Sequence, residues 1–185
     1  MLTLSMHCNS QSPIFNLYNS YLTVPPNAYI KDMYNEFDQF EGTWVLDDGT
    51  NYLKIIILKK EQVFTGQIYQ DLLIGEYLYK KNGVVVINSL PQLNAAVQSI
   101  YLHKIWGSYI PFTPSPFFSY TDDNFRVSLT FRETIESFTI DIRRTEINGE
   151  QVIQIFKRII QSPRKQGSPA PINIVPNGLY YLKKV

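Results

Sequence analysis

The chain has 185 residues, a length that fits one domain with extra segments at its ends. Its 17 basic and 16 acidic residues leave a formal charge of +1. A surface without a strong field of one sign argues against nucleic acid as a partner. The single cysteine excludes an internal disulfide. No apolar run reaches the ~18 residues that a transmembrane helix needs, so we expect no membrane span.

The first eleven residues are interpreted as the remnant of a signal peptide or as a disordered N-terminus. They are apolar and then small, and Cys8 and Ser10 lie two positions apart, as small residues do before a signal cleavage site. We therefore expect an exported protein, in the periplasm, in the cell envelope or secreted. Cys8 is also a candidate lipid anchor, although Ser5-Met6-His7 departs from the small residues that should precede an acylated cysteine.

Two regions follow this terminus. Residues 12–35 show neither a helical nor an alternating period, so we predict an extended N-terminal arm. Residues 36–160 are predicted to form the domain. It opens with Asp48-Gly49 between the predicted strands Thr43–Leu46 and Tyr52–Leu58, which indicates a hairpin with a type I′ turn.

Two more hairpin turns of this kind are expected at Asn82-Gly83 and Asn148-Gly149, because asparagine and glycine tolerate positive φ. Residues 161–185 are predicted to be a proline-rich tether and a last strand, Gly178–Leu182, which docks back on the domain. Further strands and one short helix (Leu90–Val97) are predicted from period and composition. The strands are Val63–Tyr69, Asp71–Tyr79, Val84–Asn88, Ser99–Tyr109, Phe125–Arg132, Phe138–Arg143 and Val152–Ile159.

Three tight turns between alternating segments predict an all-β protein with neighbouring strands paired antiparallel. We predict an up-and-down β-barrel of about 8–10 strands, because closure removes the exposed edges of a sheet. A two-sheet β-sandwich is the alternative.

The segment from Glu36 to Trp44 (Glu-Phe-Asp-x-Phe-x-Gly-Thr-Trp) resembles the opening signature of lipocalin-like (calycin) β-barrels. In that family a short helical turn leads into Gly-x-Trp at the start of the first strand, here Gly42 and Trp44. The resemblance implies that Trp44 plugs the closed end of the barrel and that an arginine from a late strand covers it. An arginine suits this role because its guanidinium stacks on an indole. The candidates are Arg143, Arg144 and Arg158.

Two further comparisons qualify this resemblance. The family's second signature, Thr-Asp-Tyr before a late strand, is matched only in part by Thr121-Asp122-Asp123. The sequence, including Asp71–Tyr77, is also similar to uncharacterised families of exported bacterial proteins, and that likeness implies no activity.

No residue pattern indicates catalysis, a metal site or a cofactor. The histidines are His7 and His103, and His103 has no nucleophile elbow near it. Glu76 is the acid of most interest, because it shares its parity with Leu72 and Ile74. If that face points inward, its carboxylate is buried and needs a partner. The opposite parity is equally apolar, so Glu76 can instead face water.

We therefore expect a protein that is not an enzyme, and two functions stay open. The first is a barrel that holds a small apolar or amphipathic ligand in its mouth. The second is a structural or interaction module of the cell envelope whose barrel is filled by its own side chains. A barrel of about eight strands is wide enough for either. The candidate lining of a ligand site is Glu76, Tyr77, Tyr101, Trp106, Phe112, Phe117 and Phe118.

Overall fold

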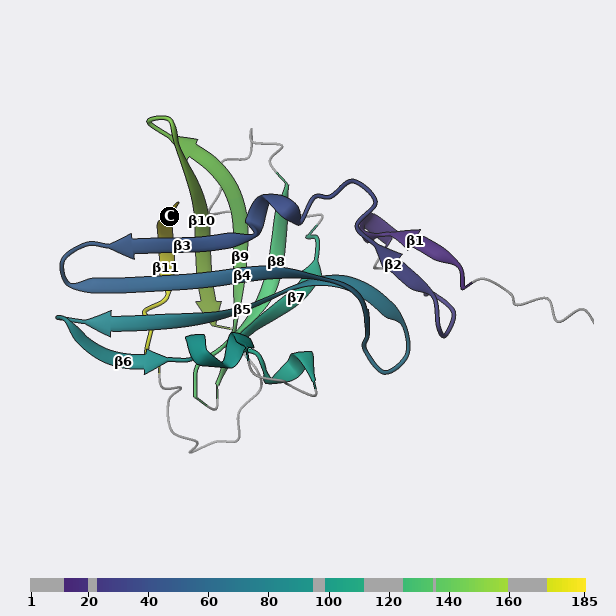
Figure 1. Ribbon diagram of the computed structural model, residues 1–185, viewed down its shortest axis with the longest axis horizontal. Helices are drawn as coiled ribbons and strands as arrows, with labels where there is room; N and C mark the ends of the chain where they lie inside the picture. The colour runs from purple at the N-terminus through teal and green to yellow at the C-terminus, as the bar shows by residue number, and fades with distance from the viewer. Residues whose placement is uncertain (1–11, 20–22, 95–98, 112–124, 135, 160–172) are drawn as a thin grey trace, which may run out of the picture.

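The computed structural model describes residues 12–19, 23–94, 99–111, 125–134, 136–159 and 173–185, and in these residues the protein is all-β (Figure 1). The strands are β1 (Ile14–Asn16), β2 (Tyr29–Lys31), β3 (Gly42–Asp47), β4 (Asn51–Phe64), β5 (Tyr69–Lys81), β6 (Val84–Asn88), β7 (Ile105–Tyr109), β8 (Arg126–Arg132), β9 (Ser137–Ile147), β10 (Glu150–Ile159) and β11 (Gly178–Lys184). Short 3-10 turns are η1 (Leu17–Asn19), η2 (Asp38–Phe40), η3 (Leu90–Asn94) and η4 (Ile100–Leu102).

Eight strands close into an antiparallel barrel in the order β3, β4, β5, β7, β8, β9, β10 and β11. The last strand returns to the first, where Lys183 pairs with Val45 and Lys184 with Trp44. The amide of Val185 adds a hydrogen bond of 3.0 Å to the carbonyl of Thr43. This closure confirms the predicted up-and-down barrel and rules out the two-sheet sandwich.

Three strands lie outside the ring. The hairpin partner β6 pairs with the end of β5, and the parallel pair β1–β2 adds to the start of β5 (Figure 1). Asp71 of β5 holds this N-terminal arm on the barrel, since its carboxylate accepts hydrogen bonds from the Tyr29 hydroxyl (2.6 Å) and the Asp32 amide (2.9 Å).

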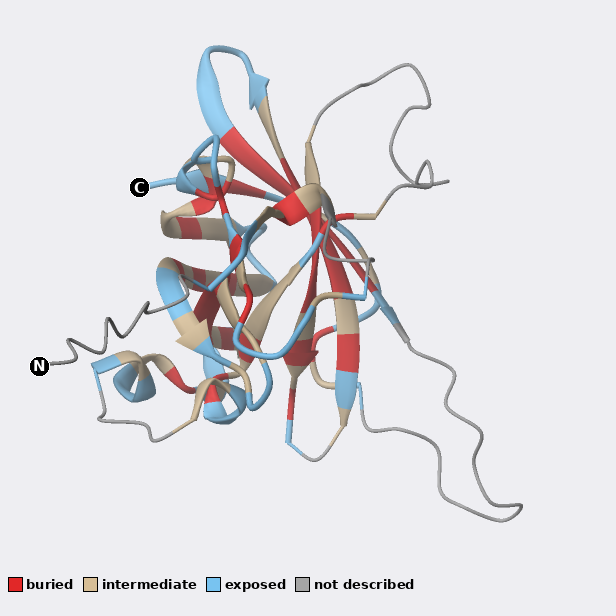
Figure 2. Cartoon of the chain, turned by 90° about the vertical axis from the view of Figure 1, so that its right-hand side faces the viewer, coloured by how far each residue is buried: buried red, intermediate tan, exposed pale blue. Residues whose placement is uncertain are grey.

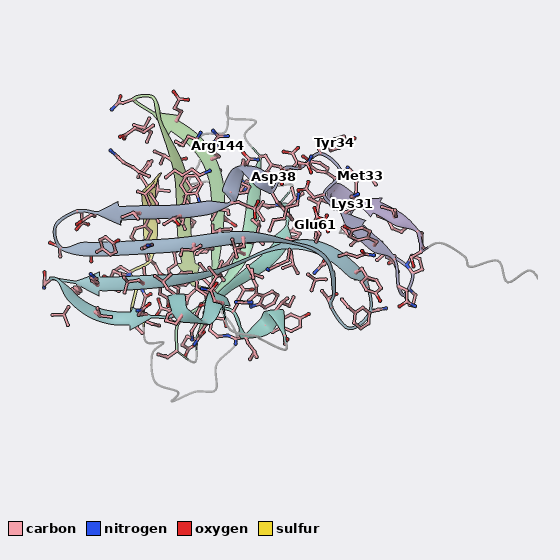
Figure 3. The ribbon with its side chains drawn as sticks, viewed as in Figure 1. Lys31, Met33, Tyr34, Asp38, Glu61 and Arg144 are labelled. Carbon is pink, nitrogen blue, oxygen red and sulfur yellow. The ribbon has the colours of Figure 1, made fainter. Side chains whose placement is uncertain are left out.

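Lys59 of β4 fastens the turn that follows the arm. Its ammonium lies 3.1 Å from the carboxylate of Asp32 and 2.7 Å from that of Asp38. The arm therefore reaches η2, and through it the start of β3, along a chain of charged contacts. Figure 3 shows labelled side chains of this region on one side of the molecule: Lys31, Met33, Tyr34, Asp38 and Glu61.

Alternate side chains of the barrel strands point inward, as strand geometry requires, and buried segments follow the strands in Figure 2. Every one of these inward hydrophobic side chains is at most 2% exposed, so the barrel has a packed core. They are Trp44, Leu53, Ile55, Ile57, Leu73, Tyr77, Tyr79, Ile105, Val127, Leu129, Phe131, Phe138, Ile140, Ile142, Ile153, Ile155 and Leu182.

The turn predictions were correct at two of three hairpins. Asn82-Gly83 and Asn148-Gly149 adopt positive φ at both residues, as a type I′ turn requires. Asp48-Gly49 does form a hairpin, but only Gly49 has positive φ. Asp48 instead accepts hydrogen bonds with its own carboxylate from the amides of Thr50 (2.9 Å) and Asn51 (2.6 Å), which stabilises a longer loop.

The segment before β7 differs from its prediction. A strand over Ser99–Tyr109 was expected, whereas Ile100–Leu102 is a 3-10 turn and only Ile105–Tyr109 is strand. The hydroxyl of Ser99 caps this turn by accepting from the amide of Tyr101. Such a local hydrogen bond competes with strand pairing and is invisible to residue alternation.

A substitution at Gly75 in β5 tests how tightly the barrel strands are packed. A Cβ built there would lie 2.7 Å from the backbone carbonyl oxygen of Ile56 and 3.4 Å from Ile105. We expect Gly75→Ala to lower the free energy of unfolding by about 1–3 kcal/mol, because backbone cannot move aside cheaply. Urea denaturation measures this. Gly49→Asn is the control, since that loop site is open and asparagine tolerates its φ; equal losses in both variants would contradict the packing argument.

Candidate functional site

Trp44 closes one end of the barrel. Its ring is fully buried and its indole Nε1 donates a hydrogen bond of 2.8 Å to the carbonyl of Phe40 in η2. The ammonium of Lys184 lies over the ring, 5.4 Å from its centre. Gly42 makes room for that lysine, because a Cβ at Gly42 would come within 2.9 Å of Lys184 Cε. The Gly-x-Trp triplet therefore packs against Lys184 of the last strand.

Within the described residues, the cation found over Trp44 is Lys184, a residue that the sequence analysis did not name for this role. Arg143 is hydrogen-bonded to Gln154, and Arg158 lies 3.5 Å from Asp141. Arg144 lies on β9, in register with Ile153 of β10. Lys184 and Trp44 come from the two ends of the domain, so no local pattern predicts their contact.

The predicted ligand-lining residues fall into separate places. Tyr77 is inside the core, where its ring stacks on Phe131 with centroids 4.6 Å apart. Burial raises the pKa of the Tyr77 hydroxyl, which donates to the carbonyl of Arg132. Tyr101 and Trp106 contact each other edge-to-face at 4.8 Å beside η4 and β7. The remaining three, Phe112, Phe117 and Phe118, lie outside the described residues.

Glu76 matches neither alternative drawn from the sequence. Its neighbour Tyr77 points inward, so Glu76 faces outward, yet its side chain is fully buried. His103 Nδ1 lies 3.0 Å from its Oε1, and the amide of Lys104 donates to the same oxygen at 3.3 Å. Within the described part of the chain, the second carboxylate oxygen has no hydrogen-bond partner. The pair fixes the segment that carries Tyr101 and Trp106.

A buried ion pair closes the other end of the barrel. Lys157 of β10 is 1% exposed, and its ammonium lies 3.0 Å from the carboxylate of Glu133. The ammonium also donates to the carbonyl of Val175 (2.6 Å) and lies 3.6 Å from the ring centre of Phe138. Glu133 accepts from the amides of Ile174 (2.6 Å) and Val175 (2.9 Å). Burial lowers the pKa of Lys157, and Glu133 opposes that shift.

This pair is a structural clasp, because both charges hold the segment that leads into β11. We expect Lys157→Met to cost about 3–5 kcal/mol of stability, since it leaves the buried Glu133 carboxylate without its cation. The double variant Lys157→Met/Glu133→Gln should recover part of this loss. Lys183→Met, which breaks the exposed pair with Glu150, should cost no more than about 1 kcal/mol. Chemical denaturation that gave equal losses for the two lysines would contradict the clasp.

A β-bulge in β7 shapes the outer face of the barrel. Trp106 pairs with Thr130 and Tyr109 pairs with Ser128, so Gly107 and Ser108 together oppose one residue of β8. Two residues three apart in a regular strand face opposite sides, but here both aromatic residues face outward with their partners. Gly107 has φ +149°, and a Cβ there would lie 3.3 Å from the backbone of β8. The glycine therefore permits the bulge.

Beside this bulge lies a groove with a volume of about 420 Å³, within the range of small-molecule sites. Its described lining combines aromatic rings, small hydroxyls and one guanidinium. The lining residues are Gln70, Trp106, Gly107, Ser108, Tyr109, Ser128, Leu129, Thr130, Thr139 and Arg158. Of these, sequence reasoning singled out only Trp106 and, for another role, Arg158. The other lining residues could be recognised only from the bulge at Gly107, and residue alternation in the sequence does not reveal a bulge.

The described residues contain no group of three or more histidine, cysteine or acidic side chains placed to hold a metal ion. Likewise, no helix in this part of the chain is long and apolar enough to cross a membrane.

The sequence matches the Family of unknown function (DUF6705) over residues 1–184. The chain belongs to this family. No curated protein and no solved structure matches it. The closed eight-stranded barrel is consistent with a lipocalin-like barrel.

The two tryptophans differ in one hydrogen bond, and this gives a matched test. Trp44 Nε1 donates to Phe40, whereas the buried Nε1 of Trp106 has no acceptor among the described residues. Trp44→Phe should therefore lose stability, about 1–3 kcal/mol for the unpaired carbonyl and more for the lost volume. Trp106→Phe removes an unsatisfied donor and should change stability by less than about 1 kcal/mol. Similar thermal shifts for both variants would contradict this assignment.

Proposed function

We propose that the protein is a non-catalytic binding module whose barrel is a packed scaffold and whose partner or ligand binds on the outer surface. The observation that carries this proposal is the filled interior. Trp44, Tyr77 and Phe131 are among the largest fully buried side chains, and they occupy the space that an apolar ligand inside the barrel would need. Both ends are also closed by the protein's own side chains, Trp44 at one and Lys157 at the other.

The non-catalytic part of the proposal is supported by the roles of the buried acids. Asp71 holds the arm, Glu133 holds the segment before β11, and Asp141 accepts a hydrogen bond from Ser128. Each of these three buried carboxylates is thus engaged in holding strands or segments together. A general acid or base needs instead to reach a substrate in a cleft.

Export is part of the same proposal, and it rests on the composition of residues 1–11. N-terminal sequencing of the mature protein from fractionated cells tests it. Cleavage near Ser10 and recovery outside the cytoplasm are expected. A lipid-modified Cys8 would move the protein to a membrane surface, and an intact N-terminus on cytoplasmic protein would contradict export.

The filled barrel is tested with an apolar probe. Wild-type protein purified from its source should show the mass of the chain alone in native mass spectrometry and no saturable binding of a fluorescent fatty acid. Phe131→Ala should open a cavity beside Tyr77 that binds benzene, at a cost of about 3–5 kcal/mol in stability. An apolar ligand that co-purifies with the wild type would favour the alternative, a barrel that carries a ligand in its mouth.

A further inference from the structure

We propose that the groove beside β7 binds a sugar that carries a carboxylate, such as a uronic acid residue of an acidic polysaccharide. This inference rests on the proposed function in one respect, namely that the ligand binds on the outer face. It is argued from three features of the groove: its aromatic side, its hydroxyl floor and its single cation.

The aromatic side is built by the bulge at Gly107. Trp106 and Tyr109 both border the groove, and Tyr101 supports the indole of Trp106 at 4.8 Å. Flat aromatic surfaces pack against the C–H face of a sugar ring, which is the apolar part of that ligand. A strand without the bulge would turn one of the two rings into the barrel core.

The floor is polar and runs across neighbouring strands. Thr130 of β8 lies opposite Thr139 of β9 in the sheet register, and Ser128 is the next outward residue on β8. On the near edge, Ser108 donates to the side-chain oxygen of Gln70 at 3.4 Å. A hydroxyl both donates and accepts hydrogen bonds, so a row of them matches the hydroxyl groups of a sugar.

Arg158 supplies the charge. Among the described lining residues it is the only charged side chain, and half of it is exposed. Its Nε lies 3.5 Å from the carboxylate of Asp141, which is longer than the usual hydrogen-bond distance, and Asp141 also accepts from Ser128. The planar end of a guanidinium binds a carboxylate through two parallel hydrogen bonds. Arg158 lies next to Thr139 in register, so the cation borders the hydroxyl row.

Other ligand classes fit this groove less well. A lipid tail needs an enclosed apolar cavity, whereas this site is open and has a hydroxyl floor. A neutral sugar would make no use of the charge of Arg158, and a simple inorganic anion would make no use of the rings of Trp106 and Tyr109.

The test is calorimetric titration of the full chain with oligogalacturonate, oligoglucuronate and oligomannuronate. We expect at least one of them to bind, more weakly as salt is raised, because an exposed ion pair is screened. The methyl ester of the same oligosaccharide should bind at least about tenfold more weakly, since it keeps the sugar and loses the charge. Arg158→Gln should reduce affinity for the acid by a similar factor and leave affinity for the ester unchanged.

Arg144→Gln is the control, because Arg144 shares β9 with Thr139 but lies opposite the core residue Ile153 in the register, and it does not line the groove among the described residues. Thr139→Val removes one floor hydroxyl at constant shape and should weaken binding about fivefold.

Three results would overturn the assignment. They are no binding of any uronate, equal binding of acid and ester, and equal effects of Arg158→Gln and Arg144→Gln. Tighter binding of a nucleotide or of a sulfated sugar would also overturn it. The packed barrel is judged separately by the apolar probe, so the two proposals can fail independently.

Discussion

Closure of the sheet between β11 and β3 is the constraint on which the rest of the structure depends. Only two residue pairs join these strands in register, and one of them brings Lys184 over Trp44. So short a junction needs support from both sides. Phe40 holds the indole from η2, and the Lys157–Glu133 pair holds the segment that delivers β11. The contact of Trp44 with Phe40 is local, whereas the pairing of β3 with β11 joins the two ends of the domain, which makes closure a long-range event.

The two barrel ends are closed by different physical means. In the sheet register, Lys157 pairs with Gly178 at the start of β11, and Trp44 pairs with Lys184 at its end. One end is therefore closed by the large apolar ring of Trp44, which lies under the solvent-exposed Lys184. The other holds a fully buried ammonium, which is tolerable because a carboxylate, a carbonyl and an aromatic ring surround it. A charge placed there fixes the position of the C-terminal segment more strictly than apolar packing would.

Residue alternation predicted most strands, because an inward face and an outward face leave a period of two in the sequence. The closed barrel was predicted because closure removes the exposed edges of a sheet. Residue alternation failed where a local hydrogen bond or a distant partner decided the outcome. Ser99 caps a 3-10 turn where a strand was expected. At Asp48, hydrogen bonds to the side-chain carboxylate stabilise a loop where a type I′ turn was expected. Glu76 is buried, but on the outer face and not on the inner face considered in the sequence analysis. Its burial there depends on His103, and no pattern within β5 predicts that contact.

The candidate site depends on the filled barrel in a direct way. Once the inward positions are used to pack the core, chemistry has to be placed on outward positions, and on a regular strand these offer one side chain in two. The bulge at Gly107 relaxes that limit by bringing Trp106 and Tyr109 to the same face. It sits in β7, which pairs with β5 by only three residues, so an irregular strand costs little pairing there. The position of the groove thus follows from where the sheet can tolerate a defect.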